Sequence, residues 1–436
     1  MKIIIAHYHL NPGGVTRIID SQIKSLKNNK HETKIEIVCG NAEDTSKYKE
    51  LDIKVDLLPN LNYLQKETYT KKEINSIFDE LYNHFSQLAT RDDIIHFHNP
   101  NLGKNPVITC CLYKLASEGY KTFNHAHDFA EDRPENMAFN RFIIEKLFGL
   151  NLHDTLYPIR FSNYRFGVIN SGDKNRLIKY KVPSDRISYL PNPVNMPQLP
   201  NDREKQKCRK TILKKLNLKS SKKIITYPVR VIRRKNIGEL ILLSELFKNE
   251  ATFLVTLAPQ NPVEIKYYNE WKTFCKENRL DNLLFEVNKQ VEFGTLINGS
   301  DFCITTSVRE GFGMTYMEPW LYDTPVIGRN IDYITFDFID NGLIFTNLYD
   351  NLYLEDMKTD FKTLTMQEQM DVILKITYNS TQRKTMFSNN PDLKKLLNKI
   401  DNDIIEKNKS LIIKNYSFEN YGRKILETYK RFFGKY

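Results

Sequence analysis

The sequence lacks the features that mark several classes of protein. None of its six cysteines forms a Cys-x-x-Cys pair, and scattered thiols of this kind are typical of a reduced, cytosolic chain. No apolar run approaches the ~18 residues of a membrane-spanning helix. The N-terminal run MKIIIAHYH is also too short for a signal peptide. We expect a cytoplasmic protein, and peripheral contact with the inner face of an anionic membrane stays open.

Internal repeats and low-complexity tracts are absent too, and no histidine follows residue 153. The 436 residues, 41% hydrophobic and 27% charged, have the composition of a soluble globular protein of two or three domains. The net charge of +11 favours an anionic partner, such as a phosphorylated small molecule or an acidic membrane surface. Nucleic acid is not expected, because aromatic residues are not interleaved with the most basic stretch, 202–223.

Short apolar, β-branched runs alternate with amphipathic segments along the chain. Strands are predicted at 2–6, 34–40, 53–58, 93–98, 121–126 and 165–170, and helices at 15–26, 70–89 and 107–117. The basic stretch 202–223 is interpreted as a linker followed by a helix. A second series then has strands at 223–230, 252–257, 282–287, 301–307 and 324–328 and helices at 237–247, 263–277 and 313–322. The alternation predicts two doubly wound parallel sheets, in domains 1–200 and 201–416, with helix 417–436 returning to the first.

The most specific segment is REGFGMTYMEPW, in which seven residues separate Glu310 from Glu318. Gly311 and Gly313 permit a tight turn and a close approach of the backbone to a ligand. The residues from Met314 onwards are predicted to be helical, and the free N–H groups at such a helix start form a diphosphate site. Glu318 would lie about one turn inside the helix, where it can bond vicinal hydroxyls such as those of a ribose.

Two further loops are candidates for ligand binding. In YPVRVIRRKN, Arg230 ends a predicted strand and Lys235 precedes the next helix. Both would therefore project from the carboxyl edge of the sheet, where two cations can neutralise a diphosphate leaving group. The NPGG turn with Gly13 and Gly14 is weaker evidence, because such pairs mark turns more often than ligand sites.

Three His-x-His pairs lie at the ends of predicted strands: His7/His9, His96/His98 and His125/His127. Residues two apart on a strand share a face, so a pair can clamp a metal ion, as in metal-dependent hydrolases. Such hydrolases add a ligand from late in the chain, and here no histidine follows residue 153. We expect the pairs to line a polar cleft, with purely structural histidines as the alternative.

The segment HDFAEDRPENM places a highly charged loop directly after one of these strands. Such a loop is a good place for an acceptor, and Arg133 could hold a carboxylate or a phosphate. A solvated loop with local ion pairs explains the charges equally well.

Together these segments resemble the retaining GT-B glycosyltransferases of family 4, over most of the chain. The resemblance is carried by PGG, DIIHFHN, HAHD, INSGDKNRLIKYKVPSDRISYLPNPV, VRVIRRKN and, most specifically, the Glu-x7-Glu element in TTSVREGFGMTYMEPW. It implies two Rossmann-like domains facing across a cleft, with a nucleotide-sugar donor held by the second. It also implies transfer of the sugar to an acceptor hydroxyl with retention, in glycan or glycoconjugate biosynthesis, with no metal or other cofactor. The acceptor would be a sugar, a glycan or a small anionic molecule.

The resemblance also implies a role for each matching residue. Arg230 and Lys235 would hold the diphosphate, Glu318 the ribose, and Glu310 hydroxyls of the donor sugar. His127 would contact that sugar near its sixth carbon. The remaining donor-side residues are Gly14, near the diphosphate and the acceptor, and Gly311. The backbone N–H groups of Gly313, Met314 and Thr315 would bind the phosphates or sugar hydroxyls. The acceptor-side candidates, suggested by the strand-end segments themselves, are His98, His125, Asp128 and Arg133.

The sequence departs from the family pattern at two places. PVR stands where many members have a glycine before the arginine, and TLAP stands where many have a glycine-rich turn. Three alternatives stay open: a nucleotide-sugar epimerase on the same scaffold, a metal-dependent hydrolase that uses the histidine pairs, and a non-catalytic protein that binds nucleotide-sugars or polyanions.

Overall fold

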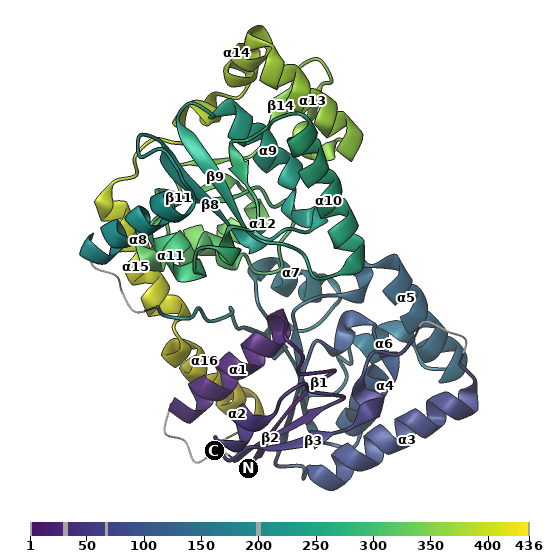
Figure 1. Cartoon of the computed structure of the whole chain (residues 1–436). Coiled ribbons are helices and arrows are strands. Elements are labelled where there is room, and N and C mark those ends of the chain that lie inside the picture. The colour runs from purple at the N-terminus through teal and green to yellow at the C-terminus, as the bar shows by residue number, and fades with distance from the viewer. Residues whose placement is uncertain (1, 29–33, 66–68, 198–201, 435–436) are drawn as a thin grey trace. The chain divides into compact units, whose positions relative to one another are not determined.

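The protein consists of two compact α/β units (Figure 1). The computed structural model describes residues 2–28, 34–65, 69–197 and 202–434. Unit 1 comprises Met1–Pro193 together with Tyr416–Tyr436, and unit 2 comprises Val194–Asn415. The division expected from the sequence was 1–200 with 417–436, and 201–416.

Unit 1 is built on a seven-stranded, entirely parallel sheet with the strand order β3-β2-β1-β4-β5-β6-β7. Its strands are β1 (Lys2–His7), β2 (Lys34–Cys39), β3 (Lys54–Leu57), β4 (Ile94–His98), β5 (Lys121–Ala126), β6 (Tyr164–Val168) and β7 (Ile187–Tyr189). The strand order reverses direction between β1 and β4, the kind of point at which open α/β sheets bind ligands.

Helices cover both faces of this sheet, so its strands are apolar on both sides. In β1, Ile3 and Ile5 face the core under α1 (Gly14–Asn28) and α16 (Phe418–Phe433), whereas Ile4 faces the opposite core. That second core lies under α3 (Lys71–Leu88) and α4 (Pro106–Ser117). The shorter helices of unit 1 are α2 (Ser46–Lys49), α5 (Pro134–Arg141), α6 (Leu152–Leu156) and α7 (Ser171–Lys179).

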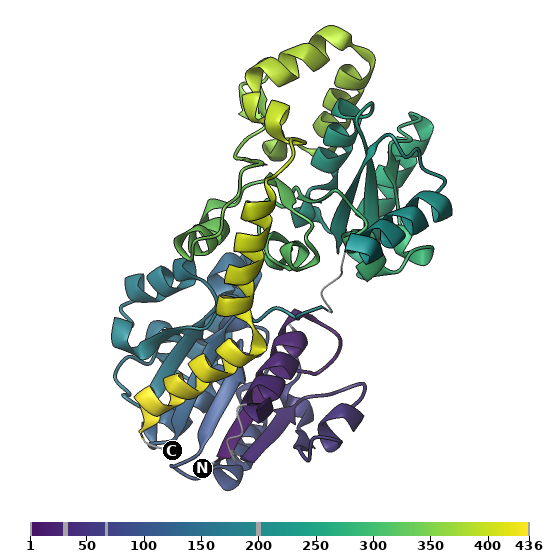
Figure 2. The same cartoon turned by 90° about the vertical axis from the view of Figure 1, so that its left-hand side faces the viewer.

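The C-terminal helix α16 is part of unit 1 and packs along α1 (Figure 2). Its start is defined by Ser417, whose Oγ accepts a hydrogen bond from the N–H of Asn420 at 3.3 Å. Its apolar face enters the core beside β1 through Tyr421, Ile425, Leu426 and Tyr429. Burial of this face ties the end of the chain to its first strand and first helix.

Unit 2 has a six-stranded parallel sheet with the order β10-β9-β8-β11-β12-β13. Its strands are β8 (Lys223–Arg230), β9 (Ala251–Leu257), β10 (Leu283–Leu284), β11 (Phe302–Thr305), β12 (Val326–Arg329) and β13 (Leu348–Tyr349), and a small antiparallel pair joins β14 (Tyr353–Leu354) to β15 (Thr359–Asp360). The predicted fold class, two doubly wound parallel sheets, is confirmed. The predicted strand 282–287 is shorter than expected.

The helices of unit 2 also lie on both faces of its sheet. They are α8 (Asp202–Lys215), α9 (Ile237–Leu246), α10 (Pro262–Glu277), α11 (Phe293–Asn298), α12 (Asp332–Asp340), α13 (Met366–Tyr378), α14 (Ser380–Asn389) and α15 (Asn402–Tyr416). Within the residues that the structure describes, no helix combines the length and the apolar character needed to cross a membrane.

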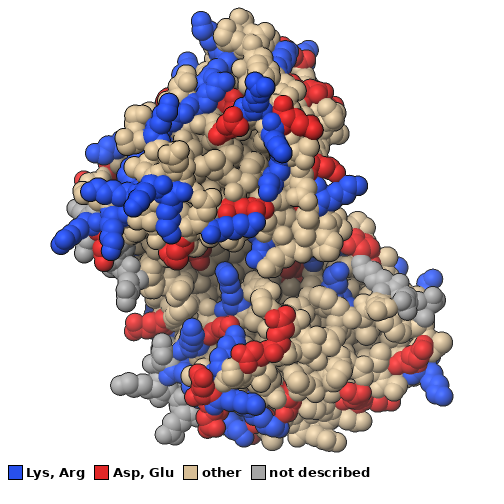
Figure 3. Space-filling view, in the orientation of Figure 1, with Lys and Arg blue, Asp and Glu red and all other residues tan. Residues whose placement is uncertain are grey.

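The basic stretch at 202–223 contains helix α8, over which Lys and Arg side chains gather (Figure 3). Ile212 anchors this helix in the core beside β8 and β9. Arg209 pairs with Asp301 at 2.6 Å, and Lys215 donates to the carbonyl of Gln290 at 2.9 Å. Some of the cationic side chains of α8 are therefore engaged in contacts within unit 2.

A fully buried arginine joins three parts of unit 2. Arg329, at the end of β12, is 1% exposed and directs all of its N–H-bearing nitrogens at oxygen atoms. It makes two hydrogen bonds to Glu239 of α9 (2.7 and 2.8 Å), two to Asp360 of β15 (2.8 and 2.9 Å), and one to the carbonyl of Asp350 (2.8 Å). Tyr349 of β13 donates to the same Glu239 at 2.6 Å.

We expect Arg329→Met to destabilise unit 2 by about 3–5 kcal/mol, because it leaves the buried carboxylate of Glu239 without its cation. The control is Lys375→Met, which removes an exposed ion pair to Asp356 and should cost less than about 1 kcal/mol. Urea unfolding followed by tryptophan fluorescence measures both, since the two tryptophans, Trp271 and Trp320, lie in unit 2. Equal effects of the two changes would contradict this account.

Candidate functional site

The loop after β8 is held in a defined position at the carboxyl edge of the unit 2 sheet. Its last residue, Lys235, is followed by Asn236 in the left-handed conformation (φ 52°), from which α9 starts. The hydroxyls of Tyr227 and Thr306 both donate to the carbonyl of Lys235, the second at 2.9 Å. The N–H of Val308 donates to the carbonyl of Arg234 at 2.9 Å, so this loop and the loop after β11 are bonded to each other.

Glu310 is the centre of the charged groups at this edge. One of its carboxylate oxygens pairs with the ammonium of Lys235, and the other accepts from Arg234 at 2.5 Å. The Glu310 and Lys235 side chains are 7% and 9% exposed, whereas Arg234 is 43% exposed. Tyr333 holds the backbone of Glu310, donating to its carbonyl and accepting from its N–H at 3.1 Å each.

The ionisation state of Glu310 follows from these contacts. Burial alone would raise its pKa, but the charges of Lys235 and Arg234 outweigh burial and hold the pKa of Glu310 below its ordinary value. Glu310 is therefore a carboxylate at neutral pH, with its two oxygens fixed by two cations.

The segment after Glu310 differs from the predicted helix. It forms two short 3₁₀ turns, Met314–Tyr316 and Glu318–Tyr322, instead of one α-helix. The reason is Pro319, which has no N–H to continue an α-helical ladder. No α-helix starts at Met314, so the predicted helix dipole at this position is wrong. The N–H groups of Met314 and Thr315 still precede the first internal bond, from Tyr316 to the carbonyl of Gly313 at 2.9 Å.

Gly313 is required by the backbone of this turn. Its φ of +85° lies in the left-handed region, and an added Cβ would come within 2.4 Å of Cγ2 of Ile334. Gly14 in unit 1 is different: a Cβ there would meet no atom within 4 Å. Backbone conformation and packing therefore explain why residue 313 is a glycine, but packing does not explain the glycine at position 14.

The structure brings only some of the predicted donor-side residues together. Lys235 and Glu310 are in direct contact, and Glu318 is half-buried at the start of the second 3₁₀ turn. Arg230 ends β8 with an exposed side chain and forms no ion pair with a carboxylate in the described part of the chain. Sequence reasoning missed Arg234, whose signal was the run of three cations in VIRRKN.

In unit 1 the strand ends of β4 and β5 are joined by a residue that sequence reasoning also missed. Asn99 takes the left-handed conformation (φ 67°), and its Oδ1 accepts from the backbone N–H groups of His127 (3.1 Å) and Asp128 (2.9 Å). Arg133 pairs with Asp128 at 3.2 Å, and both are partly exposed. The structure thus places His127, Asp128 and Arg133 beside one another at the strand end.

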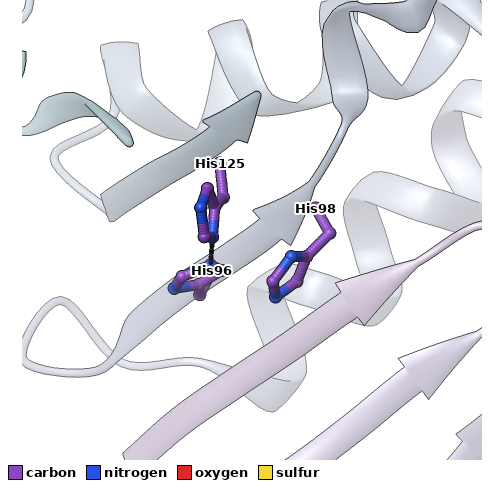
Figure 4. A group of neighbouring side chains, drawn as sticks. All are labelled: His96, His98 and His125. Carbon is purple, nitrogen blue, oxygen red and sulfur yellow. Dashed lines mark hydrogen bonds between the residues drawn. The ribbon is translucent and has the colours of Figure 1, made fainter. Parts of the chain in front are cut away.

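Four buried histidines lie on the face of the sheet that α1 and α16 cover. His96 and His98 come from β4, and His125 and His127 from the end of β5 and the residue after it. His96 and His125 are hydrogen-bonded at 3.2 Å (Figure 4), and His98 and His127 at 3.0 Å. Burial lowers the pKa of each, that of His125 to about 3, so all four are neutral at neutral pH.

Three of these rings raise the question of a metal site. Nitrogen atoms of His96, His98 and His125 lie within 4.8 Å of one another (Figure 4). However, the nitrogens of His96 and His98 are already bonded, to Tyr429, Gln22 and the other histidines. A metal ion would have to replace these hydrogen bonds, and the group contains no carboxylate to balance its charge. The donor set fits a hydrogen-bond network better than a metal centre.

Comparison with known proteins places this geometry in context. No protein-family model matches the chain. The chain is 32% identical over 345 residues to "Mannosylglucosyl-3-phosphoglycerate synthase" of Petrotoga mobilis, a match that covers 76% of this chain and 66% of that protein. The chain thus spans just under two thirds of this relative.

Two of the solved structures that match nearly the whole chain illustrate its fold. A glycosyltransferase from Rickettsia africae aligns with a TM-score of 0.62 and 18% identity, over 99% of this chain and 98% of that one. HepE from Anabaena, solved in complex with UDP and glucose, aligns with a TM-score of 0.60 and 13% identity, over 98% and 99%. The chain has the GT-B fold. The fold expected from the Glu-x7-Glu resemblance is thereby confirmed.

We expect the purified protein to contain less than one equivalent of zinc or any other transition metal, because the imidazole lone pairs are engaged in hydrogen bonds. Elemental analysis after expression in metal-supplemented medium measures this. A His125→Gln variant is the matched control for adventitious binding. A stoichiometric metal that this variant loses would overturn the network assignment.

We expect unit 1 to lose stability on acidification well before unit 2. Burial lowers the pKa of His7 to about 4 and that of His125 to about 3, from 6.5 in the unfolded chain. Below pH 6.5 the unfolded state therefore binds protons that the folded state does not. At pH 5.5 these two residues alone should cost about 3 kcal/mol relative to pH 7.5.

Unit 2 provides the internal control for this prediction, because no histidine follows residue 153. Hydrogen exchange at peptide resolution, corrected for the intrinsic effect of pH on exchange, measures both units in one sample. Equal losses of protection in the two units would contradict the role of the histidines.

Proposed function

We propose that the protein is a retaining glycosyltransferase that moves a sugar from a nucleotide-diphosphate sugar to an acceptor hydroxyl. The observation that carries the proposal is the carboxylate of Glu310, held by Lys235 and Arg234 at the carboxyl edge of the unit 2 sheet. The fold is shared with HepE, which was solved with UDP and glucose. A diphosphate needs cations and a sugar needs hydrogen-bond acceptors, and this edge offers both.

The similarity to a mannosylglucosyl-3-phosphoglycerate synthase indicates sugar transfer. It also supports a small anionic acceptor, because the product for which that relative is named includes a phosphoglycerate group. In unit 1, Arg133 is the candidate to bind the anionic group, and Asp128, its ion-pair partner, would then be displaced or shared.

Departure of the diphosphate is the step that most needs electrostatic help. Negative charge grows on the leaving group in the transition state, and preorganised cations stabilise it without reorganisation of solvent. Lys235 is nearly buried and fixed by its loop. The exposed Arg230 and Arg234 would complete the cationic edge on binding. The N–H groups of Gly313, Met314 and Thr315 would add hydrogen bonds to the phosphates, beside Gly311.

The remaining roles concern the sugar and the ribose. Glu310 would accept hydrogen bonds from donor-sugar hydroxyls, and Glu318 from the two ribose hydroxyls. His127 of unit 1 would contact the sugar. Gly14, which has no side chain, would leave space for the diphosphate and the acceptor. Attack of the acceptor on the face that the leaving group departs from gives retention. This reaction needs no metal, and we propose none.

Two of the acceptor-side candidates, His98 and His125, are buried too deeply to contact an acceptor. His98 and His125 have no exposed surface, and their rings are bonded to other buried groups. A bound acceptor could not reach them without disrupting the core of unit 1. We therefore assign to them the support of His127 rather than contact with an acceptor.

We expect Lys235→Ala to lower turnover by about 100-fold or more, since it removes a cation from the leaving group.

Glu318→Gln should raise the KM for the nucleotide-sugar about tenfold, because it weakens charge-assisted hydrogen bonds to the ribose. Lys375→Ala and Glu250→Gln, two exposed positions of unit 2, are the matched controls. Release of nucleoside diphosphate from a panel of nucleotide-sugars and acceptors measures all four.

Two readouts make this experiment decisive. Nucleoside diphosphates should raise the melting temperature of the wild type and of the control variants. The rise should be smaller for Lys235→Ala. Near-normal activity of both site variants would refute the site. Consumption of nucleotide-sugar without any acceptor would favour an epimerase, and binding without turnover on any acceptor would favour a non-catalytic protein.

A further inference from the structure

Gln22 of α1 lies at the junction of the two histidine pairs and has no exposed surface. Its Oε1 lies 2.7 Å from Nε2 of His98, and its Nε2 lies 3.1 Å from the hydroxyl of Tyr429 on α16. The Tyr429 hydroxyl in turn lies 2.5 Å from Nδ1 of His96. One amide thus contacts both branches of the network, and because its two ends differ, its orientation determines where the protons lie.

The first branch runs from Gln22 to His127. The amide Oε1 can only accept, so Nε2 of His98 carries the proton and donates to it. His98 is neutral, so its Nδ1 is unprotonated and accepts from Nε2–H of His127 at 3.0 Å. A neutral His127 that is protonated at Nε2 has an unprotonated Nδ1. At 8% exposure, His127 is the one residue of the four with measurable exposure.

The second branch runs through Tyr429 in the same sense. The amide N–H of Gln22 donates to the Tyr429 oxygen, and the Tyr429 hydroxyl donates to Nδ1 of His96. His96 then carries its proton on Nε2 and donates to Nδ1 of His125 at 3.2 Å. The proton of His125 is left on Nε2, a buried atom without a hydrogen-bond partner among the described residues. The two branches are mutually consistent with a single orientation of the amide.

We infer that Gln22 is a positioning residue that fixes the tautomer of His127, so that His127 presents an unprotonated Nδ1 as a hydrogen-bond acceptor for a ligand hydroxyl. That the hydroxyl belongs to the donor sugar rests on the proposed function; the tautomer itself does not. A fixed acceptor favours a group that can donate a hydrogen bond, a hydroxyl or an amine, over one that can only accept. Gln22 would then determine which ligand group is accepted beside His127, although two imidazole rings separate Gln22 from the ligand.

Substitution of Gln22 by methionine should reverse the first branch. Methionine has nearly the same shape but offers no strong acceptor to His98. His98 would keep a buried N–H without a partner unless its proton moves to Nδ1, where it can donate to His127. The proton of His127 then moves to Nδ1, at the accessible end of the network, where water satisfies it. The change costs little packing but changes His127 from acceptor to donor.

The experiment is nitrogen-15 NMR of protein labelled at histidine, with the His127 signals assigned from a His127→Asn variant. In the wild type, Nδ1 of His127 should show the shift of an unprotonated, pyridine-type nitrogen and Nε2 that of a pyrrole-type nitrogen. Gln22→Met should invert or mix this pattern. Tyr429→Phe is the matched control: it removes the hydroxyl next to His96 but leaves the bond between Gln22 and His98, so His127 should be unchanged.

Activity gives an independent readout of the ligand hydroxyl. With the nucleotide-sugar that the wild type uses best, we expect Gln22→Met to lower kcat/KM by about tenfold, the loss of one hydrogen bond. Fluorine in place of the contacted hydroxyl is a weak acceptor and cannot donate a hydrogen bond. We expect the wild type to lose more kcat/KM on such an analogue, relative to the natural nucleotide-sugar, than Gln22→Met loses.

Each outcome bears on a separate part of the inference. A wild-type His127 protonated on Nδ1, or a pattern that Gln22→Met leaves unchanged, overturns the tautomer assignment. If Gln22→Met does not fold, the wild-type spectrum alone decides the tautomer. A correct tautomer with unaltered discrimination in Gln22→Met overturns the hydroxyl contact. A wild type without turnover on any nucleotide-sugar counts against the proposed function, while the spectra still test the role of Gln22.

Discussion

A parallel sheet that helices cover on both faces is open to solvent only at the two ends of its strands, and open α/β sheets bind ligands at the carboxyl end. Both units obey this constraint. In unit 2, Lys235 and Glu310 follow β8 and β11 and form an ion pair there, to which Arg234 adds a second cation. In unit 1, His127 and Asp128 follow β5 and are tied to the end of β4 by Asn99. The chemistry of the chain is therefore concentrated in short loops whose positions the sheets determine.

The histidines within β4 and β5 break this rule, and the structure around them offsets the cost. A buried imidazole without partners would lose its hydrogen bonds to water. Gln22 from α1 and Tyr429 from α16 replace those bonds for His98 and His96. The same bonds join the first helix and the last helix of the chain to the middle of the sheet. A polar network of this kind specifies one arrangement of α16, which an apolar face alone would specify less well.

The sequence predicted best what depends on local pattern. The strands were found because buried strands are short, β-branched runs, and the fold followed from their alternation with amphipathic helices. The α-helix after Gly313 was predicted wrongly, although Pro319 was visible and argued against it. Arg234 stood in a run of cations that hid its role. Asn99, Gln22 and Tyr429 act through residues far from them in the chain, and no spacing within a single sequence reveals such pairs.

Charge balance explains why Glu310 can stand in the proposed diphosphate site. Arg230, Arg234 and Lys235 carry three positive charges against one carboxylate, so these four groups retain an excess of two. Without the carboxylate, the nearly buried Lys235 would have no counter-charge before a ligand arrives, and its loop would be less firmly held. In the proposed function, a diphosphate would share Lys235 and bind the exposed arginines, and the oxygens of Glu310 would become free for sugar hydroxyls. The same ion pair would thus keep the site ordered when empty and supply acceptors when it is filled.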